Sequence, residues 1–521
     1  MIPLPVDIQY KEGEFHLNSN TCICSKSNLK KMVKYFQGLI KESIGYDLKE
    51  EDNINKSNSI NFILDDSLRN LKDEGYILEV FKETISIKAL AIKGIFYGIQ
   101  TLRQLLHVEL TKKKNSEENI QIIPCVRIED YPRFKWRGFM LDVSRHFHDV
   151  DTIKHILDLL ALMKMNVFHW HLTDDQGWRI EIKKYPKLIE IGSKREDTKI
   201  KTWWSKKYRG KPHHGFYTQE DVKEVVTYAQ DRYITVIPEI EMPGHCRAAI
   251  AAYPELSCQK RQKEVAIKPG IFRDIFCIGR EETFDFLKNT LNEMIELFPS
   301  DIIHIGGDEV PLKRWKNCTD CKRKMKNEKI KKIENLRNYF TQRIVVYLKS
   351  QNKNAIGWNE ILYDGIDKDV IAQWWLGKKS RILNHIHSGG SIVASHLFHV
   401  YLDYNYILIP LQKTYSFEPI PKKLNDKYHK KILGVEAPLW CEWVPDRERL
   451  EWQIFPRLVA VAEIGWTLRE NKNYKSFIKR LKYFNEKLDA LGVNYAPLKD
   501  VSPTKPYRIL KWKNALKWPE V

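Results

Sequence analysis

The sequence predicts an α/β protein in which a small α/β domain precedes a (β/α)8 TIM barrel. Two observations predict the barrel. Short apolar runs alternate with amphipathic stretches over roughly 330 residues, which is typical of parallel strands joined by helices. Charged and aromatic residues also follow most of these runs, at the strand ends where the active sites of such barrels lie. An open doubly wound sheet is the competing architecture.

The small α/β domain is expected over residues 1–130. The polar stretch at 111–119 predicts a loop, and the turn Asp130-Tyr131-Pro132 places the domain boundary at residue 130. The expected strands are Ser59–Leu64, Gly75–Val80, Thr84–Ala89 and Ile122–Ile128, and the expected helices are Asn28–Lys41 and Lys93–Leu106.

The barrel is expected over residues 131–500, with residues 501–521 as a C-terminal tail packed on it. Thr218 with Asp221 three residues later is a relaxed capping box, which predicts a helix start. The expected strands are Gly138–Val143, Asn166–Leu172, Ile234–Ile240, Ile302–Gly306, Ala355–Trp358, Val370–Trp375, Ser391–Ala394 and Ile432–Leu439. The expected helices are Val150–Met163, Thr218–Asp231, Glu281–Leu297, Leu336–Lys349 and Leu450–Ile464.

Composition and charge exclude several classes of protein. Hydrophobic residues make up 43% and aromatic residues 12%, with 24 Gly and 22 Pro, so disordered and collagenous chains are excluded. The net charge of +19 comes partly from lysine runs such as 322–332, which we interpret as solvated surface. Attraction to anionic polymers is the alternative, but we expect no nucleic-acid partner. Since no window reaches the ~18 apolar residues of a membrane span, we expect no membrane partner.

The N-terminal residues and the number of cysteines indicate the cellular location of the protein. The first residues, MIPLPVDIQYKEGEF, lack the basic and apolar regions of a secretory signal, and nine Cys form an odd set. We therefore expect a cytoplasmic protein, or a secreted one if a leader was removed. Cys318 and Cys321 are spaced as half of a zinc ribbon, but Cys258 and Cys277 are not spaced as a second knuckle. Packed or surface thiols are expected there, with zinc as the alternative, and the oligomeric state is not predicted.

The segment Ile302–Glu309, with the sequence IIHIGGDE, is the strongest indication of chemistry. Two glycines free the backbone just before the adjacent acids Asp308 and Glu309. Neighbouring strand residues point to opposite faces, so both acids reach one pocket only if the chain turns there. An exposed acidic turn is the alternative for this segment alone. Other expected strand ends carry further polar residues: Asp142, Arg145, His169, His171, Asp174, Asp175, Glu239, Glu241, His245, Glu360 and Glu442.

Tryptophan is the second indication, because Trp358, Trp374, Trp375 and Trp440 lie at the ends of three of the expected strands. Indole faces stack on the C–H faces of sugar rings, while neighbouring carboxylates accept hydrogen bonds from hydroxyl groups. Taken singly, each Trp is explained as well by core packing. The coincidence of all four with carboxylates predicts a carbohydrate pocket.

A metal site is one alternative. His169 and His171 share a strand face and have the chemistry to ligate a divalent ion together with His245, His304 or Asp308, as in metal-dependent barrel hydrolases. A non-catalytic sugar-binding protein is the other alternative. The histidine pair lies on the second strand and no helical His-x3-His pattern accompanies it, so we expect no metal. No phosphate-binding loop, dinucleotide fingerprint or nucleophile elbow is present, so we expect no cofactor.

Six blocks in order carry a resemblance to the bacterial β-N-acetylhexosaminidases of glycoside hydrolase family 20. They span the whole expected barrel, and residues 1–130 resemble the small domain that precedes it in that family. The blocks are Arg137–Phe147, Asn166–Trp178, Ile237–His245, His304–Glu309, Gly357–Glu360 and Gly434–Glu442. The resemblance implies hydrolysis of terminal β-linked N-acetylglucosamine or N-acetylgalactosamine with retention, by substrate-assisted catalysis through an oxazolinium-type intermediate. The implied partner is an oligosaccharide or glycoconjugate substrate.

The resemblance also implies roles for individual residues. Glu309 is expected to be the general acid/base, and Asp308 to hold the substrate's 2-acetamido group. Arg145, Asp403 and Glu442 are expected to bind sugar hydroxyls, and Asp174 and His245 to support the catalytic pair. Trp358, Trp375 and Trp440 are expected to wall the pocket, and Tyr401 to reach the acetamido oxygen. Trp374 beside Trp375 leaves that alignment ambiguous by one residue.

Overall fold

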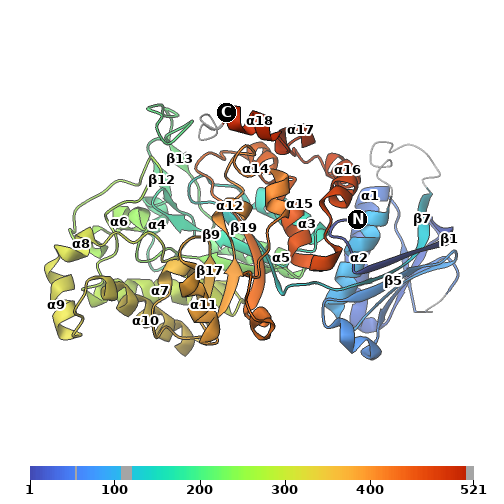
Figure 1. Cartoon of the computed structure of the whole chain (residues 1–521), viewed down its shortest axis with the longest axis horizontal. Coiled ribbons are helices and arrows are strands. Elements are labelled where there is room, and N and C mark those ends of the chain that lie inside the picture. Colours follow the sequence, from blue (N-terminus) through green and yellow to red (C-terminus); the bar gives the residue numbers. More distant parts are fainter. Residues whose placement is uncertain (53–55, 107–119, 512–521) are drawn as a thin grey trace. The chain divides into compact units, whose positions relative to one another are not determined.

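The computed structural model describes residues 1–52, 56–106 and 120–511, so the loop expected at 111–119 lies outside the described residues (Figure 1). The chain divides into two compact units. One comprises Met1–Lys135, Leu159–Met165 and Val459–Tyr495, and the other comprises Trp136–Asp158, Asn166–Leu458 and Ala496–Val521. Within the described ranges, no helix is long and apolar enough to cross a membrane.

The first unit is built on a seven-stranded mixed sheet with the order β1-β7-β5-β6-β4-β2-β3. Helix α2 (Ile92–Leu105) packs against β5 and β6, and α1 (Lys30–Ile44) packs against α2. The unit also contains α16 (Tyr474–Ala490). The strands are β1 (Asp7–Leu17), β2 (Cys22–Ser25), β3 (Lys49–Glu51), β4 (Ser59–Leu64), β5 (Tyr76–Val80), β6 (Thr84–Ala89) and β7 (Gln121–Asp130).

Three of these strands were not predicted, and each gives a weak sequence signal. The edge strand β1 is mostly exposed, and its pairing with β7 shifts register between Tyr10 and Glu14, so its hydrophobic alternation is interrupted. Strand β2 has four residues and β3 has three, which is too short for a periodic pattern.

The second unit contains the predicted barrel. Eight parallel strands close in the order β14-β15-β16-β17-β18-β19-β8-β9, which confirms the (β/α)8 architecture. Helix α5 packs against β14, α10 against β16 and α11 against β18. The strands are β8 (Trp136–Asp142), β9 (Val167–His171), β14 (Thr235–Glu239), β15 (Ile302–His304), β16 (Asn354–Trp358), β17 (Ile371–Trp374), β18 (Ser391–Ala394) and β19 (Ile432–Leu439).

Helices and short hairpins fill the connections between the barrel strands. The predicted capping box of Thr218 and Asp221 is present at the start of α5. The hairpins pair β10 (Thr173–Asp174) with β11 (Gly177–Trp178) and β12 (Lys194–Arg195) with β13 (His213–His214). The helices of these connections are α3 (Val150–Leu162), α4 (Lys187–Glu190), α5 (Gln219–Gln230), α6 (Arg247–Ala252), α7 (Glu281–Leu297), α8 (Lys313–Lys316), α9 (Thr319–Asn327), α10 (Glu334–Ser350), α11 (Lys379–His387), α12 (Leu397–Val400) and α13 (Leu411–Tyr415). The helices α14 (Arg447–Ile454), α15 (Arg457–Trp466), α17 (Leu498–Val501) and α18 (Lys505–Lys511) follow the last barrel strand, β19.

The barrel interior changes character along its axis. Near the amino ends of the strands it is an apolar cluster, whereas the carboxyl ends carry buried acids and histidines such as Glu239 and His171. The cluster is formed by Trp136, Val167, Ile237, Ile356, Ile371 and Val393. The apolar end supplies the packing, and the polar end holds the candidate site.

The C-terminal segment packs against the second unit. The side chain of Arg508 in α18 donates a hydrogen bond to the carbonyl of Ile407 at 2.8 Å, and the backbone N–H of Ala496 donates to the carbonyl of Phe455 at 3.1 Å.

Candidate active site

A cavity of about 430 Å³ opens at the carboxyl ends of the barrel strands. The structure brings most of the predicted site residues to its wall: Arg145, His245, Asp308, Glu309, Trp375, Tyr401, Asp403, Trp440 and Glu442. Asp174 and Trp358 are buried behind this wall. The wall also contains residues that the sequence reasoning did not select: Trp203, Gly270, Ile271, Leu397, Tyr404, Asn405, Leu408 and Trp443.

The chain turns sharply after β15, as the glycine pair predicted. Gly306 and Gly307 have φ values of +60° and +95°. A Cβ atom on Gly306 would lie 1.9 Å from Oε2 of Glu241. The turn continues into Glu309, which itself has a φ of 47°. The left-handed path allows Asp308 and Glu309 to face one cavity, although they are adjacent in the chain.

The two acids differ in exposure. The side chain of Asp308 is 11% exposed, whereas that of Glu309 is 36% exposed and reaches the open part of the cavity. One oxygen of each acid and a His245 nitrogen lie within 4.8 Å of one another. Burial raises the pKa of Asp308 to about 7, and Glu360, Glu239 and Glu309 add to this effect, which His245 partly offsets. Among the described residues, Oδ1 of Asp308 has no hydrogen-bond partner.

His245 links the acids to a second carboxylate pair. Its Nδ1 lies 3.1 Å from Asp175 and 3.3 Å from Asp174, and its Nε2 lies 3.6 Å from Glu309 and 3.8 Å from Asp308. Burial would lower the pKa of His245, but Asp174, Asp308 and Asp175 outweigh it and raise the pKa well above its usual value. A protonated imidazole here stabilises negative charge on both acids.

Arg145 is a further charged residue of the cavity wall. Its guanidinium pairs with Asp174 at 2.6 Å and Asp142 at 3.0 Å, and its Nε donates to Gln176 at 2.8 Å. These contacts fix the side chain beside the Trp440 ring, whose centroid is 4.9 Å away. The orientation of Arg145 is therefore set before any ligand binds.

Two further acids, Asp403 and Glu442, line the cavity. Burial raises the pKa of both carboxyl groups, and each also feels the negative charge of neighbouring acids. Oδ1 of Asp403 has no hydrogen-bond partner among the described residues. Buried oxygens without partners suit a ligand that supplies hydroxyl donors.

Aromatic rings form the remaining wall. Trp375 donates its Nε1–H to Glu360 at 2.8 Å, and its ring lies nearly parallel to Tyr401, with centroids 6.1 Å apart and planes at 23°. Trp374 instead lies beside His396 at 5.7 Å and does not line the cavity, so Trp375 is the wall residue of the pair. Trp358 is fully buried and packs 5.5 Å from Trp440, with its Nε1–H donated to Glu239 at 2.9 Å.

The histidines of the metal alternative lie beneath the wall in a buried cluster with two acids. Glu239 contacts Nε2 of His169 at 2.9 Å, Nδ1 of His304 at 2.7 Å and Nδ1 of His171. Glu436 contacts Nδ1 of His169 at 2.8 Å. Burial lowers the pKa of both His169 and His171, but the acids outweigh it and raise the values to about 9 and about 10. These carboxylates engage both ring nitrogens of His169 and the Nδ1 atoms of His171 and His304, whereas Nε2 of His304 has no hydrogen-bond partner among the described residues.

Glu241, one of the polar residues predicted at the strand ends, lies against Gly306 of the turn, although the sequence assigned it no role. Neither of its buried carboxyl oxygens has a hydrogen-bond partner among the described residues. Burial raises its pKa well above the usual value, and the charges of Asp308 and Glu239 raise it further. The sequence could indicate Glu241 only by its position after the third barrel strand. Its contact with Gly306 and its interaction with Asp308 join different strands, so the sequence could not predict them.

Four cysteines from two distant segments also meet in this unit. Cys318 and Cys321 lie beside Cys258 and Cys277, although the sequence spacing gave no sign of the second pair.

The barrel, the paired acids and the aromatic wall define a glycoside hydrolase. Residues 134–469 match the catalytic domain of glycosyl hydrolase family 20, and residues 1–131 match domain 2 of the same family. The chain therefore belongs to glycosyl hydrolase family 20, as the six sequence blocks predicted.

Individual relatives agree with this assignment. A β-hexosaminidase of Porphyromonas gingivalis is 39% identical over 95% of this chain, which spans 64% of that protein's length. A β-hexosaminidase of Vibrio furnissii is 34% identical, over 89% of this chain and 76% of its own length. The crystal structure of a family 20 exo-β-N-acetylglucosaminidase from Vibrio harveyi, in complex with N-acetylglucosamine, has a TM-score of 0.84 and 31% identity. That match covers 96% of this chain and 78% of the other.

Proposed function

We propose that the chain is an exo-acting, retaining β-N-acetylhexosaminidase. Its substrates are terminal β-linked N-acetylglucosamine or N-acetylgalactosamine units of oligosaccharides or glycoconjugates. The observation that carries the proposal is the adjacent pair of Asp308 and Glu309, which share one left-handed turn and one cavity with His245. The cavity of about 430 Å³ lies at the small end of the roughly 300–1,000 Å³ of ligand pockets, which suits a terminal sugar rather than a long chain.

The placement of the two acids supports substrate-assisted catalysis. An ordinary retaining glycosidase sets two carboxyl groups ~5 Å apart across the scissile bond, and one of them attacks the sugar. Here the carboxyl groups follow each other on one turn, so the acetamido group of the substrate takes the nucleophile's place. Glu309 protonates the glycosidic oxygen as that bond breaks, and the acetamido carbonyl oxygen forms the new bond to C1.

Asp308 acts on the acetamido nitrogen. In its ionised form it accepts the amide N–H and stabilises the positive charge that develops on the oxazolinium ring. Glu309, now a carboxylate, then removes a proton from a water molecule that attacks C1. The ring opens, and the β configuration is retained after two inversions.

The remaining wall residues bind the sugar. Arg145, Asp403 and Glu442 present polar groups to the hydroxyls, while Trp375, Tyr401 and Trp440 enclose the ring and the acetamido methyl. Trp358 supports Trp440 from behind, and Asp174 holds both Arg145 and His245.

The test is release of nitrophenol from the β-N-acetylglucosaminide and the β-N-acetylgalactosaminide, with and without EDTA in the assay. Glu309→Gln should lower kcat by ~10²–10⁴, the usual contribution of a general acid. Glu334→Gln, at an exposed acid in the first turn of α10, is the matched control and should keep wild-type turnover. Near-normal turnover by Glu309→Gln would refute the proposed role. Turnover abolished by EDTA even at saturating substrate would favour the metal-dependent hydrolase, and ligand binding without turnover would favour a sugar-binding protein.

A further inference from the structure

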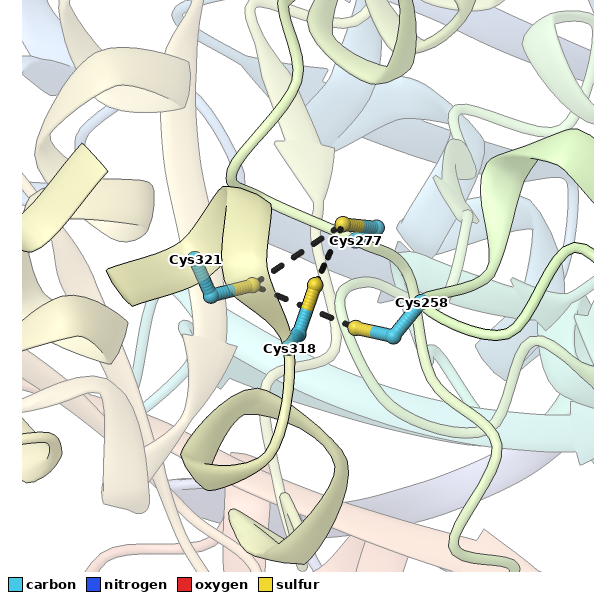
Figure 2. Close-up of side chains that lie close together, drawn as sticks. All are labelled: Cys258, Cys277, Cys318 and Cys321. Carbon is cyan, nitrogen blue, oxygen red and sulfur yellow. Dashed lines mark hydrogen bonds between the residues drawn. The ribbon is translucent and has the colours of Figure 1, made fainter. Parts of the chain in front are cut away.

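The four cysteines that the proposed reaction leaves unused form one cluster. Cys258 and Cys277 come from the segment between α6 and α7, and Cys318 and Cys321 from the start of α9. Figure 2 shows the four side chains pointing toward one another. The Sγ–Sγ distances are 3.7 Å for Cys277–Cys318, 3.8 Å for Cys277–Cys321 and 3.9 Å for Cys258–Cys321, and all four sulfurs lie within 4.8 Å of one another.

These distances distinguish between the chemistries available to cysteine. A disulfide requires sulfurs about 2.05 Å apart, and the four cysteines are free. Four thiolates around a tetrahedral Zn²⁺, with Zn–S bonds of about 2.3 Å, lie about 3.8 Å from one another. Three of the six sulfur–sulfur separations therefore match the edges of a zinc–thiolate tetrahedron, and the other three do not exceed 4.8 Å.

Two features of the surroundings place positive charge beside the cluster. Cys318 is the N-cap of α9 and Cys321 lies in its first turn, where backbone N–H groups and the helix dipole stabilise negative charge. Arg280 adds a positive charge beside Cys277, and its guanidinium is held by the carbonyl of Ser257. Cys277, Cys318 and Cys321 are buried, which limits access of solvent to a bound ion.

The backbone is shaped to bring the two segments together. A Cβ atom on Gly279 would lie 2.3 Å from the carbonyl carbon of Asp320 and 2.4 Å from the nitrogen of Cys321. Only glycine permits this approach, which places Cys277 against the first turn of α9.

We propose that Cys258, Cys277, Cys318 and Cys321 bind one Zn²⁺ as four thiolates. Four protein ligands fill the tetrahedron and leave no position for water or substrate, so the site is structural rather than catalytic. The zinc takes no part in bond cleavage. The metal site and the proposed hydrolase activity can therefore fail independently in experiments.

The position of the cluster indicates that a bound zinc would hold two loops of the cavity wall together. The segment between Cys258 and Cys277 carries Gly270 and Ile271, which line the cavity, and it is held to Asp175 by the backbone N–H of Ala266 at 3.0 Å. Helix α9 follows the loop that carries Asp308 and Glu309. The zinc thus ties the loop after β14 to the loop after β15. Its loss should raise KM more than it lowers kcat, because the pocket wall loosens while the acids remain.

Metal analysis of the full chain, purified without chelator, tests the proposal. We expect about one zinc per chain in the wild type and a loss of at least tenfold in the Cys318→Ser/Cys321→Ser variant. The matched control is Cys22→Ser/Cys24→Ser, another buried pair with sulfurs 3.9 Å apart, which should keep its zinc. Zinc retained by the Cys318→Ser/Cys321→Ser variant would overturn the assignment, as would iron in place of zinc in the wild type.

A second measurement needs no variant and so does not depend on its folding. Titration of the wild-type protein with a mercurial, in the presence of a zinc indicator, should release zinc in step with modification of four thiols. Replacement by Co²⁺ should give the intense absorption of a tetrahedral cobalt–thiolate site. Four thiols that react with no metal released, or disulfides among these cysteines by mass spectrometry, would overturn the proposal.

Discussion

Removing the charge of Glu239 should destabilise the barrel more than any surface substitution. Glu239 is fully buried among His169, His171 and His304 and also accepts the Nε1–H of Trp358. Glu239→Gln preserves the shape of the side chain but leaves protonated histidines without their main counter-charge. Breaking a buried pair in this way costs about 3–5 kcal/mol.

The pKa shifts give the same magnitude. The pKa of His171 rises from 6.5 to about 10 and that of His169 from 6.5 to about 9, after burial and attraction to the acids are combined. At about 1.4 kcal/mol per pKa unit, each shift corresponds to roughly 3–5 kcal/mol in the folded state. A loss of this size is a large part of the 5–15 kcal/mol that stabilises a typical domain.

The assay is thermal unfolding at a fixed scan rate, compared with the surface control Glu334→Gln. With about 2–4 °C lost per kcal/mol, we expect the unfolding midpoint of Glu239→Gln at pH 7 to fall by roughly 6–20 °C. Since the folded pKa values of His169 and His171 lie above the unfolded value, their stabilisation is complete below pH 6.5 and is lost as the pH rises through 9 to 10. The difference between the variant and the wild type should therefore shrink at pH 10. A difference in unfolding midpoint that is absent at pH 7, or that is equal at pH 7 and pH 10, would show that Glu239 does not stabilise the protonated histidines.

Three further predictions concern the turn after β15 and the acids beside it. In Gly306→Ala, residue 306 has a φ of +60° and its new Cβ would lie 1.9 Å from Oε2 of Glu241, so we expect loss of nitrophenyl glycoside hydrolysis. Wild-type kcat in this variant would show that the turn tolerates a side chain. Glu241→Gln should keep kcat/KM within about tenfold, because the raised pKa makes the native carboxyl group neutral and an amide preserves that state; a loss above about a hundredfold would mean that its charge is required. Since the pKa of Asp308 is raised to about 7, kcat/KM should decrease as the pH falls below 7, because protonation removes the charge that stabilises the acetamido group. A kcat/KM that stays constant down to pH 5, or the same decrease in Asp308→Asn, would contradict this.

The sequence predicts the barrel because each of its strands is an apolar run with a polar end. Even the short strands β16 and β18 lie at predicted positions, since a closed barrel needs a strand between its neighbours there. The strands β1, β2 and β3 were not predicted, because exposed edges and runs of three or four residues carry no periodic signal.

The candidate site was predicted where its residues follow strand ends, and the rest depends on contacts between distant segments. The sequence could not separate Trp374 from Trp375, because only the packing of their rings shows which one faces the cavity. Nor could it join Cys258 and Cys277 to Cys321, since the approach depends on how two loops fold over each other.

The central step of the proposed reaction is attack on C1 by the substrate's acetamido oxygen rather than by a carboxylate. The most direct test measures kcat/KM for nitrophenyl glycosides whose N-acetyl group carries zero, one, two or three fluorine atoms. Fluorine withdraws electrons from the carbonyl oxygen, so attack by this oxygen predicts a steep fall in kcat/KM with each added atom. Values that stay constant across the series would contradict substrate assistance and would require an enzyme nucleophile.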